Sequence, residues 1–246
     1  QGFSALYCLL VLRKIRDIRL EKEDFYRQPS MSLRLLKLGT PLAIQNVIIS
    51  VGGLTVQYVI NGFGFLFVAG FTATNKLYGI LEMAAVSYGY AITTYVGQNL
   101  GAKKIDRIKK GYHAALVLDL CFAAIAFVTI EALHTQISSL FLGKDGTAFA
   151  YQVSGDYMRW IGYFFIFMGI KMATDGVLRG LGIMRPFLVA NIVNLAIRLS
   201  VALICAPRFG IAFVWLAVPV GWLANFLISY VALRRSWSTD KMASIS

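Results

Sequence analysis

Long apolar runs separated by short polar breaks dominate the chain from residue 38 onward. The runs are continuous and do not alternate with a period of two, which indicates membrane helices rather than barrel strands. A helix needs roughly 20 apolar residues to cross the hydrocarbon core. We therefore predict an all-α membrane protein whose six spanning helices lie at about 38–60, 71–97, 112–136, 157–180, 186–206 and 210–233.

Glycine and proline mark the predicted breaks. No charged residue occurs between Leu38 and Asn75, a stretch too long for one span, and the segment 61–64 (NGFG) is its natural turn. Glycine and asparagine tolerate the positive φ that tight turns require. Later breaks are predicted at 101–104, 143–146, 185–186 and 207–208.

The first 37 residues differ from the rest. Residues 1–12 are apolar and basic residues follow at once, the reverse of the order in a signal peptide. We expect 1–14 to be the end of a truncated preceding transmembrane helix and 15–37 a cytoplasmic linker. The six-helix lobe is then expected at 38–235 and a cytoplasmic tail at 236–246.

Charge supports this organisation. Charged residues make up 15% of the chain against about a quarter in soluble domains, and hydrophobic residues make up 58%. The net charge of +12 comes mainly from short basic stretches between apolar runs, so it indicates membrane topology rather than nucleic-acid binding. Basic stretches occur in alternate breaks, and basic loops stay cytoplasmic. Both ends of the six-span unit, including the C-terminus, are therefore expected inside.

Two carboxylates stand out because ionisable residues at membrane depth are costly and often functional. Glu82 lies about two turns into the second span, one turn after Tyr78, and we interpret it as a cation- or proton-binding residue. The alternative is a carboxylate that only bonds a neighbouring helix. Asp175 has Lys171 and Arg179 one turn to either side, so it either binds substrate or ions or forms an internal ion pair. Asp119 and Glu131, nearer the ends of their span, rank below both.

Two sets of amides complete the candidate substrate- or ion-binding residues. Asn191, Asn194 and Arg198 form one polar stripe on the fifth span, which has to face protein or water rather than lipid. Gln45 and Asn46 mark the first span. Each set either lines a cavity or supplies interhelical hydrogen bonds, and the Asn pair favours hydrogen bonding.

Motifs of soluble enzymes are absent from the sequence. It has no P-loop, GxSxG or HExxH pattern, and its three cysteines have no metal-site spacing. We therefore expect no catalytic residue, metal or cofactor. A membrane-embedded enzyme is the least favoured function, because no nucleophile is paired with a base.

Several segments resemble the multidrug and toxic compound extrusion (MATE) family. The segment 96–111 (VGQNLGAKKIDRIKKG) is similar to the family signature that follows the second span of a lobe. KLGTPLAIQN at 37–46, LRGLG at 178–182 and a last span ending in Arg-Arg occur in family order. The resemblance covers about residues 1–235.

The resemblance implies one lobe of a twelve-helix plasma-membrane transporter, whose other, N-terminal lobe is the partner of this chain. It implies export of cationic, amphipathic drugs or metabolites in exchange for sodium or protons. Several family members carry a carboxylate in the first span of this lobe, where this chain has only the amides Gln45, Asn46 and Gln57. A lipid-linked oligosaccharide flippase of the same superfamily is the alternative, left open by Lys171 and Arg198.

Overall fold

The computed structural model describes residues 2–14, 26, 28–143 and 146–238, and it divides into two compact units, Gln1–Thr40 and Pro41–Ser246. The first unit contains α1 (Gly2–Leu12), a helix with no buried residue, and the beginning of α2 (Pro29–Asn61). Much of the predicted linker 15–37 lies outside the described residues. Its last part is helical, because α2 begins at Pro29, a residue suited to a first helical turn.

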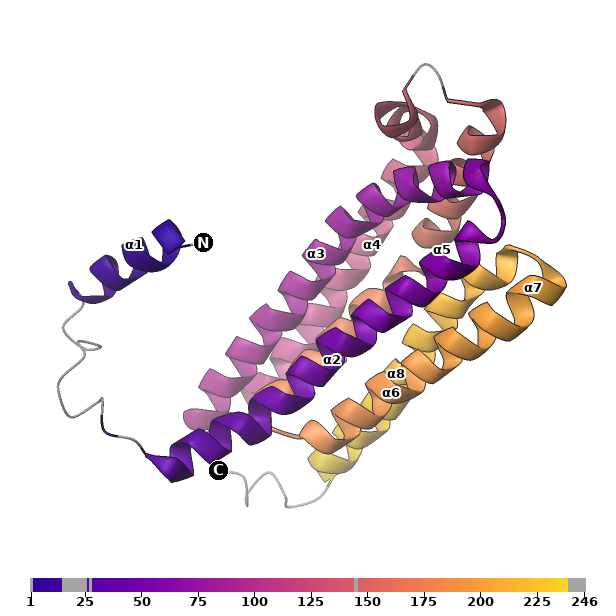
Figure 1. Ribbon diagram of the computed structural model, residues 1–246. Coiled ribbons are helices and arrows are strands. Elements are labelled where there is room, and N and C mark those ends of the chain that lie inside the picture. Colours follow the sequence, from indigo (N-terminus) through magenta and orange to yellow (C-terminus); the bar gives the residue numbers. More distant parts are fainter. Residues whose placement is uncertain (1, 15–25, 27, 144–145, 239–246) are drawn as a thin grey trace. The chain divides into compact units, whose positions relative to one another are not determined.

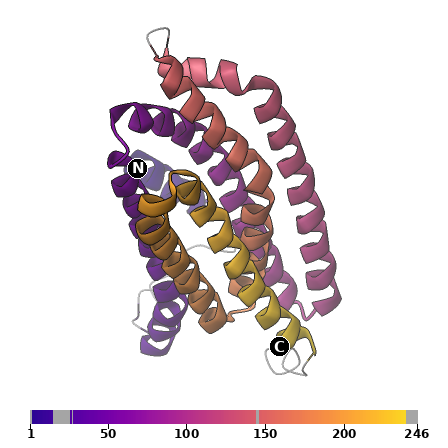
Figure 2. The ribbon, with the colours of Figure 1, turned by 90° about the vertical axis from the view of Figure 1, so that its right-hand side faces the viewer.

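The second unit is an all-helical bundle (Figures 1 and 2). No strand occurs in the described residues, and short turns join the helices. After α2 come α3 (Phe65–Gly101), α4 (Ile105–Leu142), α5 (Ala148–Gly180), α6 (Met184–Ser200), the π-helical segment η3 (Val201–Cys205), α7 (Ala206–Phe209) and α8 (Ala212–Ser238). The last helix therefore runs three residues into the predicted tail 236–246.

The predicted spans fall on these helices, but one of the helices is less apolar than the others. Among the described residues, five segments are long and apolar enough to cross a membrane: α2, α4, α5, Met184–Phe209 and Ala212–Trp237. The predicted span 71–97 lies in α3, which has 37 residues but is not among the five. Glu82 and the many hydroxyl-bearing residues of α3 dilute its apolar character.

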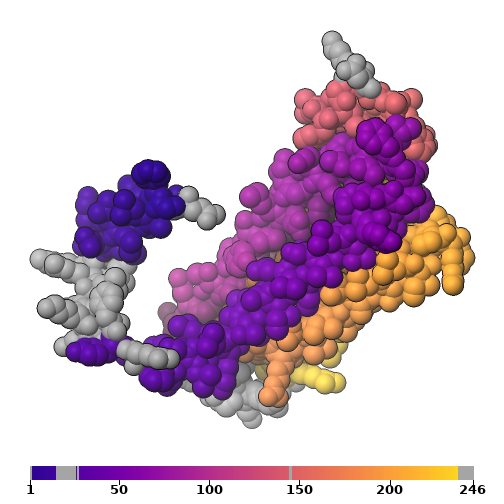
Figure 3. All heavy atoms as spheres, in the orientation of Figure 1, coloured from indigo at the N-terminus to yellow at the C-terminus, as the bar shows by residue number. Residues whose placement is uncertain are grey.

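Helix α5 forms the centre of the bundle. Of its spanning window, 72% is buried, against 22% for α4, because α3, α4 and α8 all pack against it. Helix α8 also pairs with α6. Residues Pro41–Asn61 of α2 approach the other helices less closely and cross the face shown in Figure 3, between α3 and α6. The bundle therefore has a tight centre and one looser wall.

Glycines allow α3 and α5 to approach closely. A Cβ on Gly176 would lie 2.5 Å from the carbonyl oxygen of Gly89, and one on Gly180 would lie 2.6 Å from Cβ of Val96. The Thr93 hydroxyl donates a hydrogen bond to the carbonyl of Gly176 across the interface, at 3.0 Å. Small residues four apart, with a hydroxyl bridging the backbones, are typical of tightly packed membrane helices.

The two ends of the bundle differ in charge. The α3–α4 turn, the α5–α6 turn and the end of α8 lie at one end, and the α2–α3 turn lies at the other (Figure 1). The first end carries the basic residues of three segments: Lys103, Lys104, Arg107, Lys109 and Lys110; Arg179 and Arg185; Arg234 and Arg235. The arrangement matches the alternation predicted from the loops, and the positive-inside rule predicts that this basic end is cytoplasmic.

Replacing Gly176 with alanine should destabilise the protein by about 1–3 kcal/mol, because the new methyl group overpacks the α3–α5 interface. The midpoint of thermal unfolding in detergent measures this. Gly97→Ala is the matched control, since a Cβ at Gly97 meets no atom within 4 Å. Equal midpoints for the two variants would contradict the close approach.

Labelling of single cysteines in intact cells tests the orientation. Cys8, Cys121 and Cys205 are first replaced, because all three are free thiols and none is buried. We expect an impermeant thiol reagent to modify Gly64→Cys, in the α2–α3 turn, and to spare Lys104→Cys, at the basic end. The reverse pattern would overturn the orientation.

Candidate functional site

A buried ion pair lies on α5. The Lys171 Nζ atom is 3.2 Å from Oδ2 of Asp175, one helical turn away, and the two side chains are 2% and 0% exposed. An unpaired charge in hydrocarbon is expensive. The i, i+4 spacing lets the two charges neutralise each other within one helix.

Three polar side chains join this pair from other helices. Ser229 of α8 donates a hydrogen bond to Oδ1 of Asp175 at 2.7 Å. Asn191 of α6 accepts from Lys171 at 3.3 Å, and its amide nitrogen lies 3.5 Å from Oδ2 of Asp175. Gln45 of α2 donates to Asn191 at 3.4 Å. We call these five residues the α5 network; it links α2, α5, α6 and α8.

A separate cavity of about 300 Å³ lies among α2, α3, α5, α6 and α8. We call it the Glu82 cavity, after its carboxylate. Its lining is mixed: apolar side chains and two glycines surround one amide, two tyrosines, one acid and one base. The lining residues are Ile49, Gly53, Val56, Phe71, Asn75, Tyr78, Gly79, Glu82, Tyr157, Arg198 and Val218.

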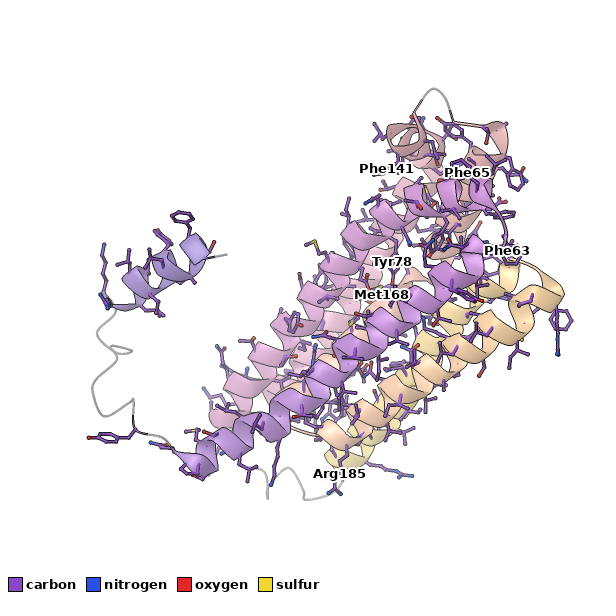
Figure 4. All side chains as sticks on the ribbon, in the orientation of Figure 1. Phe63, Phe65, Tyr78, Phe141, Met168 and Arg185 are labelled. Carbon is purple, nitrogen blue, oxygen red and sulfur yellow. The ribbon has the colours of Figure 1, made fainter. Side chains whose placement is uncertain are left out.

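The acidic part of the cavity comes from α3. The Tyr78 hydroxyl donates a long hydrogen bond to Oε1 of Glu82, at 3.4 Å. The ring of Tyr78 stacks with that of Trp222, their centroids 6.3 Å apart, which fixes the phenol inside the bundle (Figure 4). The hydrogen bond from Tyr78 orients the carboxylate of Glu82. Because Glu82 is only half-buried and lines the cavity, its carboxylate remains accessible from the cavity.

Arg198 of α6 supplies the basic part of the lining. Its guanidinium packs on Gly52 of α2, where an added Cβ would be 3.1 Å from Nη1. Its Nε atom has no hydrogen-bond partner among the described residues. The lack of a side chain at Gly52 therefore lets the guanidinium lie against α2, within the same cavity as Glu82.

Aromatic rings form one wall of the cavity. Tyr157 stacks on Trp215 with centroids 4.1 Å apart, and Phe71 stacks on both rings, at 5.2 and 5.9 Å. A small hollow continues from Tyr78 and Tyr157 toward Trp222. These rings come from α3, α5 and α8, so the wall depends on the packing of all three helices.

The predicted candidates therefore separate into two groups. Tyr78, Glu82 and Arg198 line the Glu82 cavity. Asp175, Asn191 and Gln45 instead belong to the α5 network, and Asp175 is fully buried in it. Asp175 therefore has the geometry of the internal ion pair, and a role for it in binding substrate or ions stays a prediction.

The remaining two candidates lie in neither group. Asn46 is exposed on α2, on a different face from its buried neighbour Gln45. Asn194 is buried, and its side-chain oxygen packs against Gly221 of α8. The predicted stripe on α6 therefore divides, with Asn191 in the network, Asn194 at the α8 interface and Arg198 in the cavity.

Sequence reasoning missed several residues of both sites. Ser229 and the aromatic wall carry no signal in the sequence, because serine and aromatic residues are common in spans.

Asp119, which belongs to neither site, was ranked low as a residue near a span end, but α4 begins at Ile105 and the acid is 1% exposed. It packs against Gly169, and neither carboxylate oxygen has a hydrogen-bond partner among the described residues.

The chemistry of the cavity suits the binding of a small molecule. One carboxylate, one guanidinium and several aromatic faces can hold a charged, partly apolar molecule. In the described part of the chain, no group of three or more His, Cys, Asp or Glu residues is placed to hold a metal ion.

Sequence comparison assigns a family to most of the bundle. The MatE family model matches residues 41–204. The probable multidrug resistance protein YpnP of Bacillus subtilis (strain 168) is 27% identical over 195 residues, which are 79% of this chain and 43% of that protein. The probable multidrug resistance protein YoeA of the same organism is 21% identical over 233 residues, covering 94% of this chain and 48% of that protein.

Solved structures share the fold. An outward-facing multidrug resistance MATE transporter of the MOP superfamily aligns with a TM-score of 0.84 at 18% identity, covering 99% of this chain and 54% of that chain. A variant of the Vibrio cholerae MATE transporter VcmN aligns with a TM-score of 0.84 at 19% identity, with coverages of 98% and 55%. A MOP superfamily transporter from Pyrococcus furiosus aligns with a TM-score of 0.82 at 15% identity, with coverages of 97% and 53%.

The chain spans about half the length of these proteins. Nearly the whole of this chain, 99% and 98% of it in two of the structures, aligns with them. With most of its length matched by the family model and nearly all of it by folded transporters, the chain is a multi-pass membrane protein that belongs to the MatE family.

Proposed function

We propose that this chain is one lobe of a plasma-membrane secondary transporter that exports cationic, amphipathic drugs or metabolites in exchange for sodium ions or protons. The observation that carries the proposal is the Glu82 cavity, an aromatic-walled space inside a membrane bundle with a carboxylate in its lining. The proposal agrees with the names of the two Bacillus subtilis relatives, which are described as probable multidrug resistance proteins.

The cavity has the features that an organic cation needs. The carboxylate of Glu82 offsets the positive charge, and the rings of Phe71, Tyr78 and Tyr157 in the lining offer cation–π and stacking contacts. Aromatic contacts tolerate many ligand shapes, because they require few directed hydrogen bonds. This combination favours a class of related compounds over a single substrate.

Exchange follows if the ion and the substrate compete for the same carboxylate. A proton or sodium ion on Glu82 neutralises it, and its release restores the charge that attracts the organic cation. The first span of this lobe supplies only amides, so Glu82 is the acid that we assign to this exchange. Its hydrogen bond from Tyr78 keeps the carboxylate pointed toward the cavity.

Transport also requires two lobes. Alternating access moves one repeat against the other around a site between them. The α5 network and the glycine-packed α3–α5 interface make the Pro41–Ser238 bundle suited to move as one body. We propose that a second six-helix lobe, absent from this chain, is the partner against which it moves.

Arg198 favours a second candidate function. A guanidinium in the same lining would attract an anionic group, such as the phosphate of a lipid-linked sugar. The Pyrococcus furiosus structure is described as having a binding pocket of reverse polarity that suggests a different function. Lipid flipping is therefore the alternative to drug export, and the two are separated by assaying both activities in the same liposomes.

In the complete transporter, Glu82→Gln should reduce efflux of a cationic dye by roughly tenfold or more, because one charge-assisted contact is lost. The measurement is the initial rate of dye efflux from proteoliposomes, normalised to inserted protein, under a pH gradient and then under a sodium gradient. The gradient whose effect disappears in the variant identifies the coupling ion.

The matched control is Glu131→Gln on α4. This carboxylate pairs with Arg159 at 3.5 Å, outside the cavity lining, so the same chemical change should leave efflux near the wild-type rate. If both variants transport equally well under both gradients, Glu82 has no part in binding or coupling.

A second prediction concerns the α5 network. Asp175→Asn leaves Lys171 buried without a carboxylate, and breaking a buried ion pair from one side costs about 3–5 kcal/mol. We expect much less folded transporter in the membrane, and recovery in the double variant Lys171→Gln with Asp175→Asn, which removes both charges. The readout is the folded fraction by size-exclusion chromatography.

Efflux per folded molecule then separates the two roles of Asp175. Near-normal efflux by the double variant is expected if Asp175 positions the helices. Restored folding with abolished efflux would instead assign Asp175 to the binding of substrate or ions.

A further inference from the structure

A groove on the outer surface of the bundle shares no lining residue with the Glu82 cavity. It has a volume of about 580 Å³ and runs between the start of α6 and the last turns of α8. Its walls are apolar, and Val189, Leu227 and Val231 are each about half exposed, at 52%, 51% and 49%. Arg185 and Arg235 lie in the same lining. We call this space the α6–α8 groove.

The two arginines belong to the basic end of the bundle. Arg185 is the second residue of α6 and extends from its first turn at that end (Figure 4). Arg235 lies in the last turn of α8. The groove therefore combines an apolar channel along two membrane helices with guanidinium groups from both helices at the level where the helices end.

A second hollow adjoins the groove through Arg235. It has a volume of about 560 Å³ and is lined by Lys109 and His113 of α4 with Arg234, Arg235 and Trp237 of α8. The indole nitrogen of Trp237 is buried and has no hydrogen-bond partner among the described residues. An indole N–H only donates, so the group that it lacks is an acceptor. We call this space the basic hollow.

We propose that the α6–α8 groove and the basic hollow together bind one anionic phospholipid. An acyl chain lies along Val189, Leu227 and Val231, the phosphate lies at Arg185 and Arg235, and the head group extends into the basic hollow. Charge complementarity selects this occupant, because basic pockets between helices at the membrane surface suit anionic head groups. A helix of a partner protein would fit only if it placed an acidic residue beside the two arginines, whereas an anionic phospholipid always carries its negative charge. The site is independent of the substrate that the transporter exports.

Lipid retention by the purified complete transporter tests the proposal. The protein is extracted in mild detergent, incubated with phosphatidylglycerol or with phosphatidylcholine of the same acyl chains, and examined by native mass spectrometry. We expect phosphatidylglycerol to be retained roughly tenfold better, from the contributions of two arginines. Inorganic phosphate, which lacks the acyl chain, should not displace it. Equal retention of the two lipids, or displacement by phosphate alone, would overturn the proposal.

Two matched pairs of variants locate the site. Arg185→Gln combined with Arg235→Gln should reduce retention of phosphatidylglycerol to the level of phosphatidylcholine, whereas Arg208→Gln, at the other end of the bundle, should not. Val231→Phe should fill the groove and reduce retention of both lipids, whereas Val220→Phe, at a position of the same helix with a similar exposure of 44%, should not. Wild-type retention by the double arginine variant would refute the site.

A photoreactive residue identifies the occupant in the membrane. With p-benzoylphenylalanine at Val231, illumination of native membranes should give an adduct with the mass of an anionic phospholipid. An adduct with another polypeptide or with a second copy of the transporter would overturn the proposal. Each variant is first checked for a wild-type elution profile, and any that fails is replaced by the crosslinking measurement at the same position.

Discussion

The Lys171–Asp175 ion pair constrains the arrangement of four helices. Hydrocarbon offers neither charge a partner, so each has to be compensated inside the protein. The pair forms within α5, but its remaining hydrogen bonds come from Ser229 of α8 and Asn191 of α6, and Gln45 attaches α2 through Asn191. Because removing any of these groups leaves a buried polar atom without a partner, the network specifies how α2, α6 and α8 approach α5.

The bundle uses two different kinds of interface around α5. Toward α3, glycines and threonine hydroxyls bring the backbones together with little space between them. Toward α2 the packing is looser: Gln45 reaches α5 only through Asn191 of α6, and the Glu82 cavity lies between α2 and Tyr157 of α5. A tight interface and an open one on the same central helix let the protein keep its shape while it retains room for a ligand. The acid of the cavity comes from the tightly held helix, so its position is well defined.

The helices and the ion pair were predictable because their signals are local. Apolar runs of spanning length locate the helices, and a spacing of four residues places Lys171 beside Asp175 on any helix. Which polar residue faces which neighbour depends on rotation and tilt, which the sequence does not encode locally. Gln45 is buried and Asn46 is exposed although the two are adjacent. The aromatic wall was unpredictable for a related reason, since its rings meet only after three helices have packed.

The Glu82 cavity has an electrical consequence. At about 300 Å³ it has room for several water molecules, while the surrounding bundle is a poor conductor of ionic charge. Where water penetrates a membrane protein, the transmembrane voltage falls over the remaining dry thickness instead of the whole bilayer. A cation held at Glu82 then experiences only a fraction of the roughly 2.3 kcal/mol that 100 mV imposes on a unit charge. In the proposed exchange, the depth to which water fills the cavity, and not the position of the carboxylate alone, would set how strongly the membrane potential drives the movement of ion or substrate.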